Sequence, residues 1–246
     1  MGLFDLFRKK DAPAGTDREL ARLQKMVSNK LSQNLDRHEA LQRLAELGSS
    51  EAVRILLQRF TWNLDPSITD QEEKEVAVDG IARAGKNALA PIRRFVAKAE
   101  SLSWPLKGVR RILSGEELQS ELLGWLTQFD TDYTRNPEPK IQVLQALEEF
   151  PSDETRAAVE PFLSDAVEAV RFAAVTTLFR VGKAEAAPGL VVALAEDESL
   201  RIKNRIAQGL VEQGWTLESE QVKKLGSALP FGFSVEQSRV IGAARN

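Results

Sequence analysis

The sequence contains no cysteine and only one histidine, His38. Without cysteine the chain can form no disulfide, no thiolate metal site and no cysteine nucleophile. With one histidine it cannot build a histidine-rich metal site, and a Ser–His–Asp triad would have to use His38. The sequence therefore predicts a protein that is not an enzyme and that uses no cofactor.

Long hydrophobic runs are also missing. No apolar run approaches the roughly 20 residues that span a bilayer as a helix. The short apolar stretch near the start precedes its basic residues, which is the reverse of the order in a secretory signal. Together with the lack of cysteine, these features predict a cytoplasmic protein.

Basic residues are not in excess. The chain has 33 Lys+Arg and 36 Asp+Glu, for a net charge of −3. Nucleic-acid-binding domains are usually strongly basic, so nucleic acid is not expected as a partner. The balance hides an asymmetry, because residues 1–115 carry a net charge of +5 and residues 116–246 a net charge of −8. Either the two ends prefer partners of opposite sign, or the charges only solvate helix faces.

What the sequence does contain is helical periodicity. Apolar residues recur at three- and four-residue spacing along most of the chain, as on the buried faces of helices. The first such face is predicted to comprise Leu20, Leu23, Val27, Leu31 and Leu35. No stretch alternates long enough to predict a strand, so a short helix is expected even near Val235–Gly242.

The helical pattern repeats. In the C-terminal half, an offset of 31 or 32 residues aligns Val143 with Ala174 and Ile206, Leu147 with Leu178 and Leu210, and Gly182 with Gly214. A single helix pair cannot bury both of its apolar faces, so such pairs must stack. We therefore predict an all-α fold, a right-handed α-α superhelix or HEAT-like solenoid of about six antiparallel helix pairs. Its expected parts are an amphipathic tail and linker at 1–15, N-terminal pairs at 16–129, a polar connector at 130–139, and C-terminal repeats with a terminal cap at 137–246.

The run Asp165–Asp197 resembles the HEAT-like repeat of the bilin-lyase type (PBS lyase). The matching positions are Asp165, Val170, Arg171, Ala174, Leu178, Gly182, Leu190, Leu194 and Asp197. The following repeat has Ile202 and Lys203 in place of Val-Arg and keeps Gly214. This resemblance implies a binding scaffold of the armadillo-like class, and it implies the fold more strongly than any one function.

The first candidate binding segment is Met1–Lys10. On a helix its apolar residues would cover one face and its basic residues would follow, which is the composition of a small interfacial membrane anchor. It is similar to the amphipathic ends of several bacterial peripheral membrane proteins, and it predicts contact with an anionic inner-membrane surface. The alternatives are docking to a partner protein or folding against the first helix pair. The candidate membrane-contact residues are Leu3, Phe4, Leu6, Phe7, Arg8, Lys9 and Lys10.

Two further basic groups are candidates. Arg93, Arg94, Lys107, Arg110 and Arg111 form a candidate anionic-ligand patch, for which a solvated helix face is the alternative. Arg171, Arg201, Lys203, Arg205 and Trp215 are candidate partner-binding residues. The cations of this second group either receive an acidic partner or form a ladder with carboxylates of the adjacent repeat. For Trp215 and the segment 230–233, covering the open end of the array is the alternative.

Carboxylate pairs such as Glu72-Glu73 and Glu148-Glu149 are expected on polar faces or near helix ends, and no pair predicts acid catalysis. The function predicted from the sequence is a non-catalytic adaptor whose curved helical surface binds another protein, close to a membrane if Met1–Lys10 contacts lipid. The alternative is a lyase-like or nucleic-acid-processing enzyme of the same fold, or a subunit of one.

Overall fold

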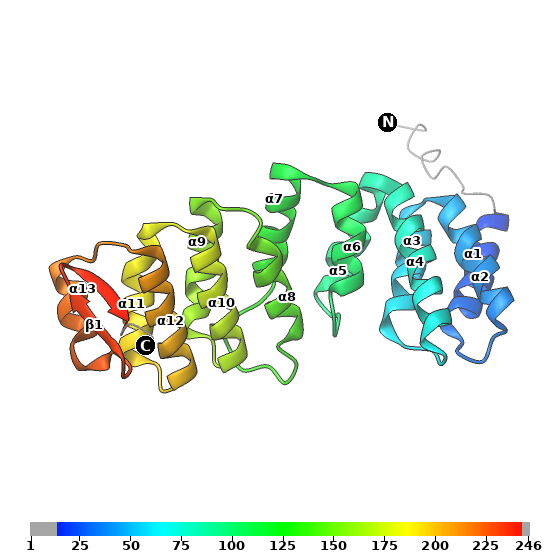
Figure 1. The fold of residues 1–246 in the computed structure, drawn as a ribbon. Helices are drawn as coiled ribbons and strands as arrows, with labels where there is room; N and C mark the ends of the chain where they lie inside the picture. Colours follow the sequence, from blue (N-terminus) through cyan, green and yellow to red (C-terminus); the bar gives the residue numbers. More distant parts are fainter. Residues whose placement is uncertain (1–13, 243–246) are drawn as a thin grey trace, which may run out of the picture. The chain divides into compact units, whose positions relative to one another are not determined.

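The computed structural model describes residues 14–242, which fold almost entirely into helices (Figure 1). These residues form two compact units. Unit 1 comprises the described residues up to Ala99 together with Ser103–Ser114, and unit 2 comprises Glu100–Leu102 and the described residues from Gly115 onward. Each unit has its own buried apolar core.

Unit 1 is a stack of helices in two layers. In one layer α4 packs against both α2 and α6, in the other α3 packs against α5, and α1 packs against α2 and α3. Its elements are α1 (Ala14–Ser28), α2 (Asn34–Leu47), α3 (Ser50–Gln58), the 3-10 helix η2 (Arg59–Thr61), α4 (Ser67–Ala84), the 3-10 helix η3 (Gly85–Ala88), α5 (Leu89–Val96) and α6 (Ser103–Ile112).

Unit 2 continues the same pattern. One layer runs from α8 through α10 and α12 to strand β2, and the other contains α7, α9, α11 and α13. Its elements are α7 (Gly115–Leu126), α8 (Glu138–Leu147), α9 (Asp153–Val159), η4 (Glu160–Ser164), α10 (Glu168–Val181), η5 (Ala184–Ala186), α11 (Ala187–Glu196), α12 (Leu200–Gln213), α13 (Ser219–Leu225), η6 (Gly226–Ala228), β1 (Phe233–Glu236) and β2 (Arg239–Gly242).

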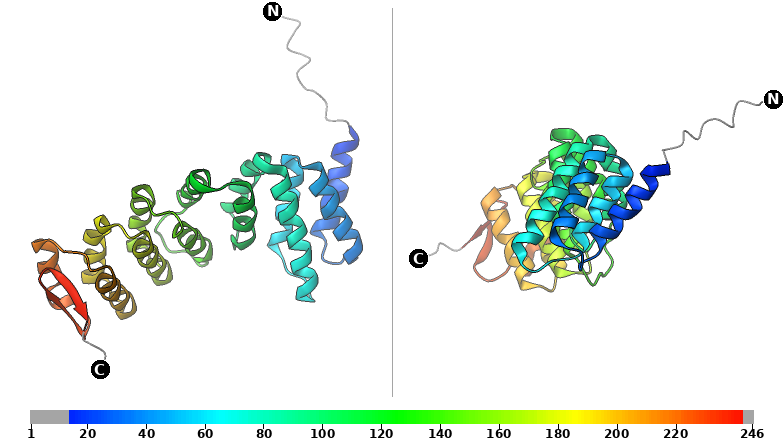
Figure 2. Two further views of the ribbon diagram at one scale, coloured as in Figure 1. Left: turned by 45° about the horizontal axis from the view of Figure 1, so that its top comes forward. Right: turned by 90° about the vertical axis from the view of Figure 1, so that its right-hand side faces the viewer.

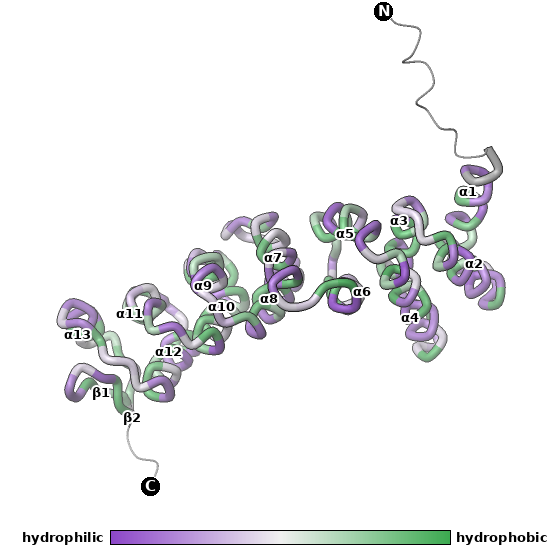
Figure 3. Tube along the Cα trace, turned by 90° about the horizontal axis from the view of Figure 1, so that it is seen from above, coloured by the Kyte–Doolittle hydropathy of each residue, from purple (hydrophilic) through white to green (hydrophobic). Residues whose placement is uncertain are grey.

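The apolar residues that the sequence period aligns are those that form the core. Leu147, Leu178 and Leu210, which the offset aligns, are all buried, and they lie on α8, α10 and α12 in turn. Along each helix, hydrophobic segments alternate with hydrophilic ones (Figure 3), because only one stripe of each helix faces its neighbours. The predicted all-α helical repeat is therefore confirmed.

Glycine ends α10 and α12, the first helices of the last two pairs. Gly182 and Gly214 have φ of 71° and 62°, and their N–H groups donate to the carbonyls of Leu178 and Leu210. Other residues adopt this left-handed conformation only at a steric cost. The predicted helix ends at these two glycines are confirmed.

The predicted face of the first helix is partly wrong. Leu23 and Val27 are buried, but Leu31 and Leu35 are 92% and 67% exposed. The reason is that α1 ends at Ser28 and α2 begins at Asn34, so the intervening turn takes Leu31 and Leu35 off the α1 face.

The division between the units falls at Gly115 and not in the polar connector at 130–139. Hydrogen bonds hold that connector within unit 2. Lys140 Nζ donates to the carbonyl of Asp132 at 2.9 Å, Ala166 N to the carbonyl of Thr131 at 2.9 Å, and Asn136 Nδ2 to the carbonyl of Glu100 at 2.8 Å.

The expectation of a terminal helix near Val235–Gly242 is wrong. β1 and β2 form an antiparallel hairpin that lies beside α12 and α13 at the end of unit 2 (Figure 2). Gln237 and Ser238 have φ of 47° and 61°, which gives a two-residue turn whose twist suits paired strands. Val240 is buried, and Leu217 N donates to the carbonyl of Ser238 at 2.7 Å. The hairpin therefore covers the end of the α12 layer, as a terminal cap must.

Candidate partner-binding surface

Arg171, the first candidate, joins two consecutive repeats. Its Nε donates to Oδ2 of Asp197 at 2.7 Å and its NH2 to Oδ1 at 3.1 Å, while its NH1 donates to the carbonyl of Asp165 at 3.0 Å. Asp197 in turn accepts from the N–H of Ser199, which opens the next repeat. The guanidinium therefore fastens the start of its own repeat to the start of the following one.

Lys140 makes the equivalent connection one repeat earlier. Its Nζ donates to Oδ2 of Asp165 at 2.9 Å and to the carbonyl of Asp132, and Asp165 accepts from the N–H of Val167. Lys140 and Asp165 are both buried. We call these two connections, Lys140–Asp165 and Arg171–Asp197, the repeat staples. Of the two alternatives left open for Arg171, the structure favours the ladder.

The staple also determines protonation. Burial would raise the pKa of the Asp197 carboxyl, but the hydrogen bond from Arg171, the Ser199 N–H and the charges of Arg171 and Lys203 outweigh it and hold the pKa below its ordinary value. The hydrogen bond to Asp197 raises the pKa of Arg171. Both groups are therefore charged at neutral pH.

Lys203 occupies the staple position of the next repeat. The residue 32 positions after Asp197, where the next aspartate is expected, is Leu229, which has no carboxylate. The repeat staples therefore end with Asp197. The charge of Lys203 helps to lower the pKa of that same carboxyl.

Arg201 and Arg205 lie one turn apart on α12, and each rests on an aromatic ring of α10. The guanidinium carbon of Arg201 is 3.9 Å from the ring centre of Phe172, and that of Arg205 is 5.2 Å from the ring centre of Phe179. Trp215 stacks on Phe179 with centres 5.7 Å apart. We call Phe172, Phe179, Arg201, Arg205 and Trp215 the arginine–aromatic strip.

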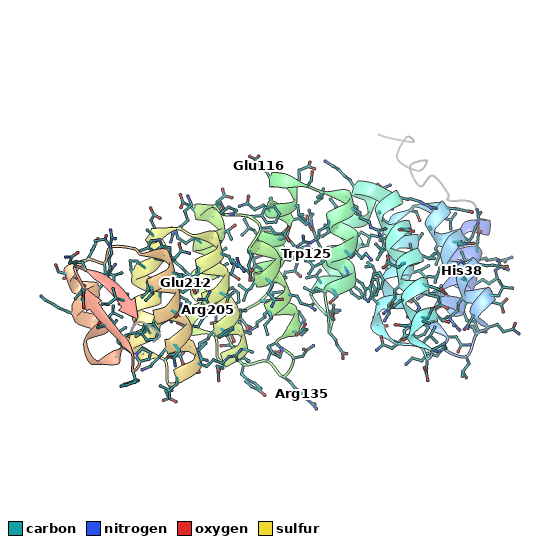
Figure 4. All side chains as sticks on the ribbon, viewed as in Figure 1. His38, Glu116, Trp125, Arg135, Arg205 and Glu212 are labelled. Carbon is teal, nitrogen blue, oxygen red and sulfur yellow. The ribbon has the colours of Figure 1, made fainter. Side chains whose placement is uncertain are left out.

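The cations of the strip differ from Arg171 in their polar contacts. Arg201 lies 3.7 Å from Glu168, and Arg205 lies 3.6 Å from Glu212, which projects from the same helix (Figure 4). Throughout residues 14–242, neither Arg201 nor Arg205 donates a side-chain hydrogen bond, so their N–H groups keep donor capacity. Arg201 is also largely exposed.

The carboxylate of Glu148 lies close enough to Arg205 to feel its positive charge. Burial raises the pKa of Glu148 on the C-terminal side of α8, and the charges of Arg180 and Arg205 offset this only in part. Arg180 lies 3.9 Å from Glu148. Basic and acidic side chains thus alternate on the surface of α8, α10 and α12 around the arginine–aromatic strip.

The candidate anionic-ligand patch is divided between two helices of unit 1. Lys107 and Arg111 on α6 pair with Glu75 and Asp79 on α4. The remaining members, Arg93, Arg94 and Arg110, are exposed on α5 and α6. Because Lys107 and Arg111 already have carboxylate partners, the patch offers less free positive charge than its sequence indicates.

A buried charge network in unit 1 was not predicted from the sequence. Glu73, expected on a polar face, is 1% exposed. It accepts from Nε of Arg37 at 3.0 Å and from Nε of Arg59 at 2.7 Å, and both arginines are fully buried. Asp70 joins the network by accepting from Arg59 and from Lys74 at 2.7 Å each. No signal in the local sequence separates Glu73 from its exposed neighbour Glu72.

The same network holds Trp62. The guanidinium carbon of Arg59 lies 4.0 Å from the indole centre, and Arg59 NH1 donates to the Trp62 carbonyl at 3.0 Å. Burial would raise the pKa of Asp70, but hydrogen bonds from Lys74, Arg59 and the Leu64 N–H lower it. Such a network costs desolvation energy and repays it only when every charge is paired, so we interpret it as structural.

Unit 2 also has a surface depression of about 510 Å³. Its lining combines apolar side chains, including Leu163 and Val192, with carboxylates such as Glu160 and Glu196. Arg156 and Lys224 pair with these two carboxylates at 2.8 and 3.0 Å. The depression therefore has little unpaired charge with which to hold a small ligand.

The part of the chain that the structure describes contains no group of three or more His, Cys, Asp or Glu side chains placed to hold a metal ion. His38 projects from α2, and its Nε2 lies 2.9 Å from Nε2 of Gln42 on the same helix (Figure 4). Within residues 14–242 no helix is both long and apolar enough to cross a bilayer. The predicted membrane-contact residues of Met1–Lys10 lie outside the described residues.

Residues 125–211 match the family model of HEAT repeats, a range that lies within unit 2 and includes α8 to α11 and most of α12. No curated protein matches the chain. The bilin-lyase subfamily is not distinguished by this match. The match and the stacked helix pairs together support a HEAT-repeat protein.

Proposed function

We propose that the chain is a non-catalytic scaffold that binds another protein through the surface of α10 and α12 that carries the arginine–aromatic strip. HEAT repeats generally serve as protein-interaction scaffolds. The proposal depends mainly on the arginine–aromatic strip, where Arg201 and Arg205 are held on aromatic rings while their N–H donors remain unfilled.

The physical argument concerns preorganisation. A guanidinium that packs against an aromatic ring has already lost part of its rotamer freedom, so binding a partner carboxylate or carbonyl costs less entropy. Arginine and tryptophan are also the residues that most often dominate the binding energy of protein interfaces. The strip supplies both types, with Arg201 and Arg205 one turn apart on α12 and Trp215 two residues after the end of that helix.

The test compares charge reversals on two helices. The intact chain should recover a stoichiometric protein partner from its native host, and the double variant Arg201→Glu and Arg205→Glu should lose at least tenfold in affinity for it. The matched control is Lys223→Glu, an exposed lysine on α13 of the same unit, which should bind as the unmodified chain does. Equal loss in both variants, or recovery of a chromophore or a nucleic acid in place of a protein, would contradict the proposal.

We also propose that Met1–Lys10 brings the scaffold to an anionic membrane surface. Support comes from its order of apolar and basic residues, Leu3 to Phe7 followed by Arg8 to Lys10. The measurement that tests this contact is described in the Discussion.

A further inference from the structure

The terminal hairpin has an unpaired edge. β2 packs against α12 as well as against β1, and Figure 3 shows β1 as the strand farther from α12. In a hairpin with a two-residue turn, the flanking residues Glu236 and Arg239 form a hydrogen-bonded pair, and the next pair, Val235 and Val240, does not. The backbone N–H and C=O of Val235 therefore point away from β2.

Nothing among the described residues occupies that edge. No hydrogen bond within residues 14–242 uses the backbone N–H of Val235, whereas the N–H of Phe233 donates to the carbonyl of Pro230 at 3.2 Å. Natural proteins usually protect such edges with lysine, proline or a bulge. The β1 sequence Phe-Ser-Val-Glu has none of these protections, and Phe231, just before it, is fully exposed.

We propose that β1 pairs with β1 of a second copy of the chain, so that the two hairpins form one four-stranded antiparallel sheet. A twofold axis beside Val235 would place this residue opposite its own counterpart. Each Val235 would then donate its N–H to the carbonyl of the other, which fills both free groups at once. An extended backbone is the only partner whose groups match a strand edge.

The side-chain charges are compatible with this register. Glu236 would lie opposite Ser234 of the second copy, so no two like charges face each other across the new ladder. Residues 116–246 carry a net charge of −8, however, and two such units repel each other at low ionic strength. We therefore expect a weak dimer, held by a short ladder, that strengthens when salt screens the repulsion.

The first test is sedimentation velocity of the full chain over a range of protein concentration and salt. The expected result is a monomer–dimer equilibrium that shifts toward dimer as either is raised. A chain that remains monomeric at every concentration and salt overturns the proposal.

The second test uses the absence of native cysteine. In the proposed register the two Val235 Cα atoms lie about 5.5 Å apart, which is within the range of about 4.4–6.8 Å that a disulfide spans. Val235→Cys should therefore form a covalent dimer under mild oxidation. Ser234→Cys, the matched control, would face Glu236 of the second copy and should cross-link at least tenfold more slowly. Similar cross-linking of both variants, or none in Val235→Cys, would exclude this register. Neither test involves the arginine–aromatic strip, so its outcome is independent of the proposed function.

Discussion

Arg59 donates from its Nε to Oε2 of Glu73 at 2.7 Å, and both side chains are almost completely removed from solvent. Arg37 reaches the other oxygen of the same carboxylate from α2. The carboxylate of Glu73 on α4 thus neutralises two buried cations, both contributed by the preceding helix pair. Asp70, also on α4, pairs with Arg59 as well, so the packing of these two helix pairs in unit 1 depends on two neighbouring negative charges.

The first prediction is that Glu73→Gln strongly destabilises unit 1. Removing the charge leaves the buried Arg37 without a counter-ion and leaves Arg59 with Asp70 alone, and breaking a buried pair in this way costs about 3–5 kcal/mol. Urea unfolding followed by far-UV circular dichroism measures the change. Glu72→Gln, an exposed change at the preceding position, should stay within about 0.5 kcal/mol of the unmodified chain. Equal effects of the two substitutions would show that the network contributes nothing specific.

The second prediction concerns pH. The pKa of Asp197 is lower in the folded chain than its ordinary value of 3.8, so the unfolded chain binds this proton more readily. The stabilisation is present above the unfolded pKa and is lost as pH falls toward and through the folded pKa. Asp197→Asn should lower the free energy of unfolding by on the order of 2 kcal/mol at neutral pH. It should also make the free energy of unfolding depend less on pH in the acid range.

Urea midpoints measured across that acid range give the comparison. The control is Glu198→Gln, a change at an exposed neighbouring carboxylate, which should keep the pH dependence of the unmodified chain. An Asp197→Asn variant with an unaltered pH dependence would contradict the role assigned to the staple.

The third prediction contrasts two glycines in helices. A Cβ at Gly209 on α12 would lie 2.3 Å from the ring of Phe179, whereas a Cβ at Gly124 on α7 would meet nothing within 4 Å. Gly209→Ala should therefore cost about 1–3 kcal/mol through overpacking and should displace Phe179 from Trp215. Gly124→Ala should stabilise by about 0.5–1 kcal/mol, because alanine favours the helix.

Thermal unfolding and tryptophan emission report the two effects separately. A higher melting temperature for Gly209→Ala would mean that Phe179 is free to move, which would contradict its place in the arginine–aromatic strip.

The fourth prediction tests the tail. Sedimentation with liposomes containing anionic lipid should retain the intact chain and leave a version without Met1–Lys10 in the supernatant, because apolar insertion and basic contacts act together. High salt and neutral liposomes should each reduce binding. Equal sedimentation of both versions would remove the membrane proposal and leave docking to a protein as the alternative.

The sequence predicted the helices because their signals are local. The spacing of Leu178 and Gly182, repeated at Leu210 and Gly214, specifies a buried stripe and a left-handed end wherever it occurs. The hairpin was missed because four-residue strands alternate too briefly to be recognised. Its turn is also formed by Gln237 and Ser238, whereas Asn-Gly or Asp-Gly usually marks this kind of turn.

The polar contacts were predictable only in part. Arg171 and Asp197 were recognised as repeat positions, and the ladder was one of two alternatives, because repetition shows which residues are equivalent without showing what they touch. Glu73 lies in a run of charged residues that is typical of a solvated helix face. Only the positions of Arg37 and Arg59, both distant in sequence, make that carboxylate part of the interior.

The staples have a consequence for the length of the array. Each basic residue, Lys140 or Arg171, receives its aspartate from the start of the following repeat, so a repeat is completed only by its successor. For Lys203 the corresponding position is Leu229, where the sequence has no acidic residue. Replacing the terminal hairpin by another repeat that begins with aspartate at this position would give Lys203 an aspartate from a following repeat, which makes this junction the natural place to lengthen the scaffold by design.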